Sequence, residues 1–119
     1  MTIRTEGCLD KASVTEMVKD ALELMIAKNC TRCLVDHRNL SSVAIGTFDI
    51  YNMPRMYSEL GLPRNFKIAM VVPQKFLESF LFLETVNRNY GYMFSIHLDD
   101  ESAQRWLNPV QESMQPPAG

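Results

Sequence analysis

Four polar residues at the expected ends of two strands have the types needed for acid–base chemistry. Asp36, His37 and Arg38 follow one short apolar run, and His97 lies near the end of another. Ligands bind beyond the carboxyl ends of the strands in open parallel sheets, and a histidine beside a carboxylate can act as a general base. No serine or cysteine nucleophile accompanies them, and the G-x-S-x-G pattern is absent. We therefore interpret these four residues as a strand-end polar cluster without a catalytic residue.

Cys30 and Cys33 form a C-x-x-C pattern, which in redox proteins lies at a helix N-terminus, where the helix dipole lowers the pKa of the first thiol. Here the order is reversed, because the pair follows a predicted helix and enters a predicted strand. The C-terminal end of a helix disfavours a thiolate, so we expect both cysteines to be structural. Cys8 and His37 would complete a zinc set, but no second closely spaced pair supports one. Glycine-rich phosphate loops are also absent. The sequence therefore predicts neither a metal nor a cofactor.

Length and composition are those of one globular domain. The 119 residues are 46% hydrophobic and 22% charged, and we place a single domain at residues 1–114 and a frayed tail at residues 115–119. The net charge of −2 argues against a nucleic-acid surface. No apolar run is long enough to span a membrane, and no apolar signal-peptide core follows Met1. Three cysteines, an odd number, favour a reducing, cytoplasmic location.

Apolar runs alternate with helical patterns along the chain. Ser13 and Glu16 form the S-x-x-E pattern of a helix start, and the polar residues 36–39 resemble a turn. The alternation predicts an α/β fold with parallel strands and right-handed crossovers. The expected strands are residues 3–10, 31–36, 66–72 and 92–98. The expected helices are residues 13–29, 47–60, 74–90 and a last one that begins at the acidic residues 99–101.

The third expected helix carries more apolar residues than one sheet face can cover. One apolar face contains Phe80 and Leu83, a second contains Leu77 and Leu81, and Phe82 points elsewhere. A surplus of this kind marks an interface or an apolar groove, unless the closing helix or the tail covers it. We expect a partner interface or apolar ligand site formed by Met53, Met56, Tyr57, Leu77, Leu81 and Phe82.

Three stretches resemble the SpoIIAA-like (STAS/SEC14-type) bacterial proteins. They are CLVDHRNL, IYNMPRMYSELGLPRNFKIAMVVP and ETVNRNYGYMFSIHLDDESAQRWL. The resemblance covers residues 7–107 and implies a compact sheet of four, or with an extra one five, mainly parallel strands alternating with four helices. Members of the uncharacterised branch are regarded as non-enzymatic proteins that bind apolar or lipid-like ligands.

Two departures from the family pattern bear on function. Family members begin with an additional N-terminal strand, and without it the segment from Ile3 to Leu9 would be an exposed sheet edge open to pairing with another chain. The anti-sigma-factor antagonists of the family carry a phosphorylatable serine in a D-S-S/T-G type loop. The matching region here contains Ser41 and Ser42 without that motif.

We therefore expect a non-enzymatic binding or regulatory module whose partner is a second copy of itself, another protein or a small apolar ligand. One alternative is a phospho-regulated switch of the anti-sigma-factor-antagonist type. The other is a small enzyme that uses Asp36, His37 and His97.

Overall fold

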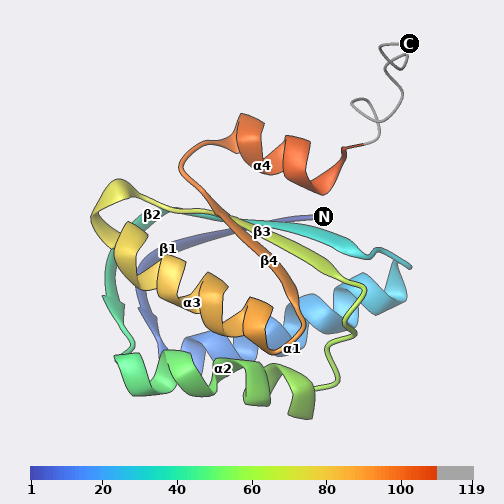
Figure 1. The fold of residues 1–119 in the computed structure, drawn as a ribbon, viewed down its shortest axis with the longest axis horizontal. Helices are drawn as coiled ribbons and strands as arrows, with labels where there is room; N and C mark the ends of the chain where they lie inside the picture. Colours follow the sequence, from blue (N-terminus) through green and yellow to red (C-terminus); the bar gives the residue numbers. More distant parts are fainter. Residues whose placement is uncertain (110–119) are drawn as a thin grey trace.

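The computed structural model describes residues 1–109, in which four parallel strands form one sheet in the order β1-β2-β3-β4. Each strand is followed by a helix (Figure 1), and this confirms the predicted alternation. The predicted tail at residues 115–119 lies outside the described residues.

The strands are β1 (Thr2–Asp10), β2 (Arg32–Ala44), β3 (Lys67–Val71) and β4 (Met93–His97). The helices are α1 (Lys11–Ala27), α2 (Thr47–Glu59), the short 3-10 helix η1 (Gln74–Phe76), α3 (Leu77–Asn89) and α4 (Asp100–Leu107).

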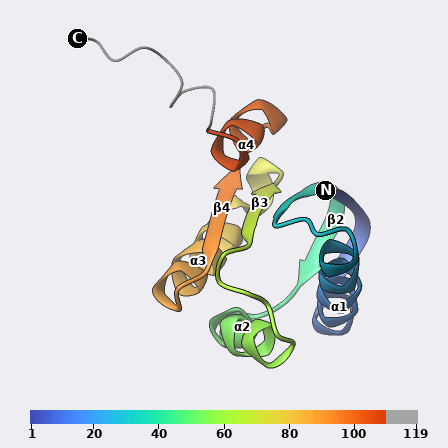
Figure 2. The same ribbon diagram turned by 90° about the vertical axis from the view of Figure 1, so that its right-hand side faces the viewer.

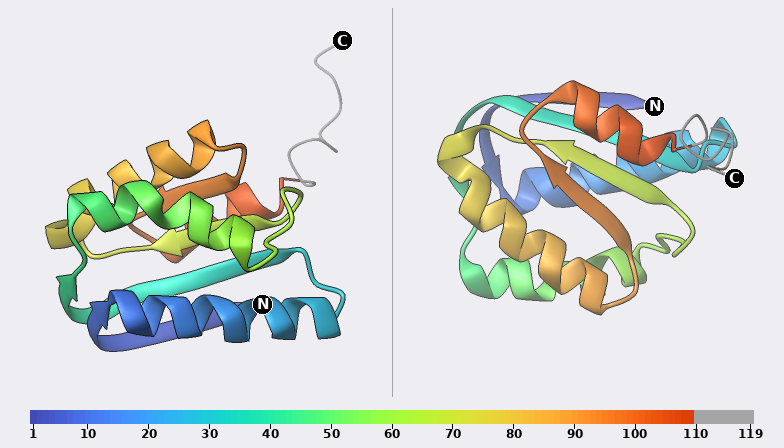
Figure 3. Two further views of the ribbon diagram at one scale, coloured as in Figure 1. Left: turned by 90° about the horizontal axis from the view of Figure 1, so that it is seen from below. Right: turned by 45° about the horizontal axis from the view of Figure 1, so that its top comes forward.

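The helices cover the two faces of the sheet unequally. Helices α1, α2 and α3 lie together on one face, and α4 lies alone on the other (Figures 2 and 3). The larger core is buried between the sheet and α1–α3. The smaller core lies under α4 and consists of Leu34, Ala69, Val71, Ala103 and Leu107, with Trp106 packed at its side. Strand β3 contributes to both cores, which is why its sequence is apolar after Lys67.

Helix α1 begins two residues before the expected start, because Asp10 rather than Ser13 caps it. The Ser13 backbone N–H donates to Asp10 Oδ1 at 2.8 Å, and the Asp10 backbone N–H donates to Ser13 Oγ at 3.0 Å. This reciprocal pair is a capping box in which Ser13 occupies the third helical position. The expected pairing of Ser13 with Glu16 was therefore wrong, although the pattern marked the correct region.

Strand β2 is much longer than predicted, and the expected turn at residues 36–39 is absent. The strand continues to Ala44 because β1 pairs with it beyond the point where β3 ends, opposite Asp36. Two register shifts against β1, at residues 36–39 and 40–42, place one extra residue of β2 at each shift. The polar residues that suggested a turn thus lie at a bulge inside a strand, where β3 and β4 stop and β1 and β2 go on.

Candidate binding cavity

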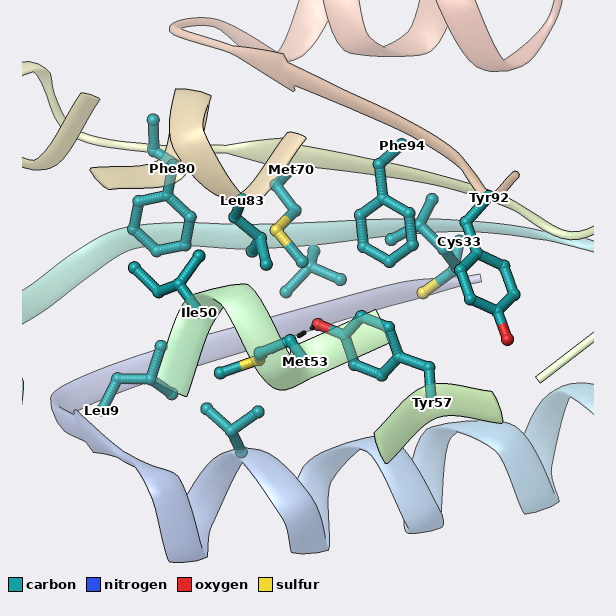
Figure 4. Packing of buried hydrophobic residues seen from close by; sticks show 14 of the residues in the cluster. Leu9, Cys33, Ile50, Met53, Tyr57, Met70, Phe80, Leu83, Tyr92 and Phe94 are labelled. Carbon is teal, nitrogen blue, oxygen red and sulfur yellow. Dashed lines mark hydrogen bonds between the residues drawn. The ribbon is translucent and has the colours of Figure 1, made fainter. Parts of the chain in front are cut away.

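An apolar cavity of about 70 Å³ lies in the larger core, lined by residues of α1, α2, α3 and the strands of the sheet. Figure 4 shows part of this region: Met53 and Tyr57 of α2 face Met70, Leu83 and Phe94 across the core. The Tyr57 hydroxyl is directed to Met53 Sδ at 3.4 Å. Methionines supply four of the lining residues, which are Met17, Met25, Met53 and Met70. Their unbranched thioether side chains adapt to irregular spaces.

Helix α1 forms one wall of the cavity through a single stripe. Its lining residues recur at helical spacing, so one face of the helix points into the core while Lys19 and Glu23 stay exposed. Within that stripe Ala21 is the smallest residue and is half-buried. The stripe consists of Val14, Met17, Val18, Ala21, Leu22 and Met25.

His37 is the histidine in the lining, and it is almost fully buried. The ring stacks on Phe80 with centroids 5.1 Å apart. The Thr5 hydroxyl donates to the carbonyl oxygen of Asp36 at 3.3 Å, and Thr5 Oγ1 lies 2.7 Å from His37 Nδ1. Both bonds form together when Nδ1 carries the ring proton, which leaves a lone pair on Nε2. Burial lowers the pKa of His37 to about 4, so the ring is neutral at physiological pH.

Asp36 belongs to the opposite face of the sheet. It is in register with Val71, whose side chain packs under α4. Arg38 donates three hydrogen bonds to the Asp36 carboxylate. Its Nε donates to Oδ1 and its Nη2 donates to Oδ2, both at 2.9 Å, and its backbone N–H donates to Oδ1 at 3.0 Å. Arg4 approaches to 3.9 Å. The hydrogen bonds from Arg38 lower the pKa of Asp36 and keep it ionised.

His97 shares this face with Asp36 but does not touch it. The two residues are in one row across β2, β3 and β4, with Val71 between them, and neighbouring strands are about 4.8 Å apart. Ser102 of α4 lies 2.9 Å from His97 Nδ1. Burial lowers the pKa of His97. Its position therefore follows from the docking of α4 and not from a pairing with a carboxylate.

The expected strand-end cluster is thus divided between two faces. Asp36 and Arg38 form an ion pair on the α4 face, His97 lies on that face beyond Val71, and His37 lies on the other face inside the core. An enzyme that uses Asp36, His37 and His97 together would need the three side chains in one place. The geometry of the sheet separates them, which argues against a single site formed by all three.

The six apolar residues expected at an interface are also divided. Met53 and Tyr57 are buried and line the cavity, whereas Leu81 is the one exposed member, at 42%. The expectation that α3 would leave two apolar sectors uncovered was too simple, because α2 packs beside α3 and shelters part of its surface. The other three, Met56, Leu77 and Phe82, are half-buried against the larger core.

Sequence reasoning missed the cavity wall on α1 and on the strands. The regular stripe of α1 and the eight methionines were visible in the sequence, but a stripe predicts a buried face and not a void. Within residues 1–109, no cluster of three or more His, Cys, Asp or Glu side chains could hold a metal ion. In the same part of the chain, no helix has the length and apolar character needed to cross a membrane.

No family model matches the chain, and no curated protein matches it. Among solved structures, it is similar to an uncharacterised protein of the DUF3478 family with a SpoIIAA-like fold from Shewanella loihica PV-4. The two share 17% sequence identity with a TM-score of 0.54, and the match covers 89% of this chain and 82% of that chain. This likeness confirms the expected SpoIIAA-like α/β fold.

Proposed function

We propose that the protein is a non-enzymatic binding module that takes a small apolar ligand into the cavity between α1, α2 and the sheet. The observation that carries the proposal is the cavity itself: about 70 Å³ of space inside a core whose lining is almost entirely hydrocarbon and thioether. Buried cavities with such linings stay dry and bind apolar molecules, and an engineered one of about 150 Å³ binds benzene or xenon.

The size of the cavity limits the chemical class of the ligand. At about half of that engineered volume, it holds a short alkyl chain or a small ring, and a larger apolar group enters when the methionines change rotamer. The lining includes the neutral His37 ring, and the Tyr57 hydroxyl in the same lining is directed to Met53 Sδ. The best ligand is therefore apolar with at most one hydrogen-bond donor, and a charged group is excluded by the cost of burying it.

The expected protein partner or second copy needs a different surface, because a cavity of this size does not admit a segment of a protein. The half-buried Met56, Leu77 and Phe82 and the exposed Leu81 remain proposed contacts for such a partner. A cytoplasmic location is also part of the proposal. It is supported by Cys8, Cys30 and Cys33, which are all free thiols.

A cavity-filling substitution tests the function directly. Ala21→Leu places an isobutyl group in the cavity, and Ala27→Leu makes the same change at an exposed position of the same helix. Thermal unfolding is measured for the wild-type protein and both variants, with and without saturating benzene. A ligand that binds only the folded state raises Tm. We therefore expect benzene to raise the Tm of the wild-type protein and of Ala27→Leu by more than it raises the Tm of Ala21→Leu.

Ala21→Leu alone should raise the free energy of unfolding by about 1 kcal/mol, as cavity-filling changes commonly do. Equal effects of benzene on all three proteins would contradict the proposal. A loss of stability in Ala21→Leu that is larger than in Ala27→Leu would show that the space is not available.

A further inference from the structure

The two edge strands of the sheet differ. Strand β4 is protected from pairing with an added strand. The backbone N–H of Ile96 donates to Glu84 Oε2 at 2.7 Å, and Arg88 Nε donates to the carbonyl oxygen of Phe94 at 2.9 Å. Glu84 and Arg88 are themselves paired, at 3.9 Å, one turn apart on α3. These side chains occupy the backbone groups that an added strand would use, which is a common way of blunting an edge.

Strand β1 has no such protection along Thr2–Glu6 within the described residues. It pairs with β2 on one side only. The Leu34 backbone N–H donates to the carbonyl oxygen of Met1, so the backbone of Met1 faces β2 and that of Thr2 and Arg4 faces outward, since the direction alternates along a strand. The extra residues at both register shifts are in β2, and β1 therefore stays regular until Gly7, whose φ is +78°.

The side chains of this open edge carry self-complementary charge. Ile3 and Thr5 are half-buried on the face that α1–α3 cover, whereas Thr2, Arg4 and Glu6 are exposed on the α4 face. Arg4 and Glu6 thus project from the same face, on either side of Thr5. A second β1 that ran antiparallel with the two Thr5 residues opposite each other would place each Arg4 against the partner's Glu6. Centring the pair on Arg4 instead would oppose the two arginines, which is unfavourable.

We propose that the free edge of β1 is a dimerisation surface, at which a second copy of this chain pairs antiparallel, β1 to β1, about Thr5. The two sheets then become one continuous sheet with four strands from each copy. Leu24 of α1 supports the assignment, because it is an exposed apolar residue on the side of α1 that faces away from α2. Thr15 lines the groove between α1 and α2, and Leu24 lies about two and a half turns later, on the opposite side of the helix. Leu24 is 48% exposed there, on the side of α1 that faces away from α2.

This proposal does not depend on ligand uptake, because pairing at the outer edge of β1 leaves the cavity wall unchanged. The test uses two charge reversals, Arg4→Glu and Glu6→Arg, and sedimentation velocity of the full chain up to millimolar concentration. Glu78→Arg, on the exposed side of α3, is the matched control. Each reversal replaces two attractive cross-strand pairs of the dimer by two repulsive ones, so we expect each variant alone to dimerise about tenfold more weakly or worse.

Mixing the two variants separates a specific register from general repulsion. An Arg4→Glu copy against a Glu6→Arg copy restores both opposite-charge pairs, so the mixture should form a heterodimer at concentrations at which neither variant alone forms a homodimer. Glu78→Arg should dimerise like the wild-type protein. A wild-type protein that stays monomeric at millimolar concentration would overturn the proposal and leave the edge to a strand of a different protein. A dimer whose dissociation constant is unchanged by either reversal would also overturn it.

Discussion

Asp36 and His37 are adjacent in the chain, and their side chains lie on opposite faces of the sheet. Asp36 pairs with Arg38 at 2.9 Å on the α4 face, whereas His37 stacks on Phe80 inside the larger core. This follows from the alternation of a strand, in which neighbouring side chains point in opposite directions. An apparent catalytic cluster in the sequence is therefore two separate features: an ion pair that fixes the bulge of β2, and a neutral ring at the wall of a cavity.

The neutral His37 ring should make stability depend on pH. Its folded pKa of about 4 lies below the ordinary value of 6.5, so the unfolded chain takes up the proton first as the pH falls. The stability contribution is complete above about pH 6.5 and is lost as the pH falls toward 4, by about 3 kcal/mol in all. Urea unfolding of the wild-type protein and of His37→Gln at about pH 7 and about pH 5 measures it.

The His37→Gln variant should lose less stability than the wild-type protein between these pH values. His97→Gln is the control, because it leaves His37 in place and should keep the wild-type dependence that arises from that ring. The same pH dependence in wild-type protein and His37→Gln would show that the buried ring does not carry it.

Removing Arg38 should destabilise the fold through Asp36. Arg38→Ala leaves a buried carboxylate with one backbone N–H and the distant Arg4, and an unpaired buried charge is costly. We expect a loss of about 1–2 kcal/mol near neutral pH, against almost none for Lys19→Ala on the exposed side of α1. Because the pKa of Asp36 is lowered in the folded state, the loss should shrink as the pH falls below about 4 and the carboxylate is protonated. Urea titrations across this range would contradict the account if the difference stayed constant.

Glu84 should protect the edge of β4. Glu84→Ala removes the acceptor of the Ile96 N–H, and hydrogen exchange at Ile96 should accelerate more than at β3 residues such as Ala69. The open edge should also promote self-association at high concentration. Glu78→Ala, also on α3 but outside this contact, should leave both properties unchanged. Unaltered protection at Ile96 in Glu84→Ala would contradict the assigned role.

Helix α4 should depend on the packing of Leu107. This residue is 3% exposed in the smaller core, and a helix of eight residues is not stable without such contacts. Leu107→Ala should cost about 2–5 kcal/mol, whereas Leu98→Ala, at a residue 46% exposed, should cost less than about 1 kcal/mol. Thermal or urea unfolding compares the two. Equal effects would mean that α4 adds little to the stability of the sheet.

The order of strands and helices could be predicted because it is encoded locally. The apolar run of β3 and the stripe of α1 need only their own residues to be recognised. The length of β2 could not be predicted, because residues 36–39 have turn-like composition and extend only because β1, far away in the chain, pairs with them. Once β2 is known to continue, the opposite directions of Asp36 and His37 follow from alternation.

The cavity could not be predicted for a different reason. A void is the difference between the volume that the elements enclose and the volume that their side chains fill. That difference depends on how Ala21, Met53 and Met70, from three separate elements, meet across the core. The sequence indicated which of these residues are apolar and on which faces they lie, and their packing then decided whether space remained.

Methionine methyl NMR with xenon tests the central proposal most directly. Protein labelled at the methionine methyl groups is titrated with dissolved xenon, which is small enough for the cavity. We expect saturable shifts at Met17, Met25, Met53 and Met70, which line the cavity, and much smaller ones at Met1, Met56 and Met93, which do not. Equal or non-saturating shifts at all methionines would show that no binding cavity exists in the core and would contradict the proposed function.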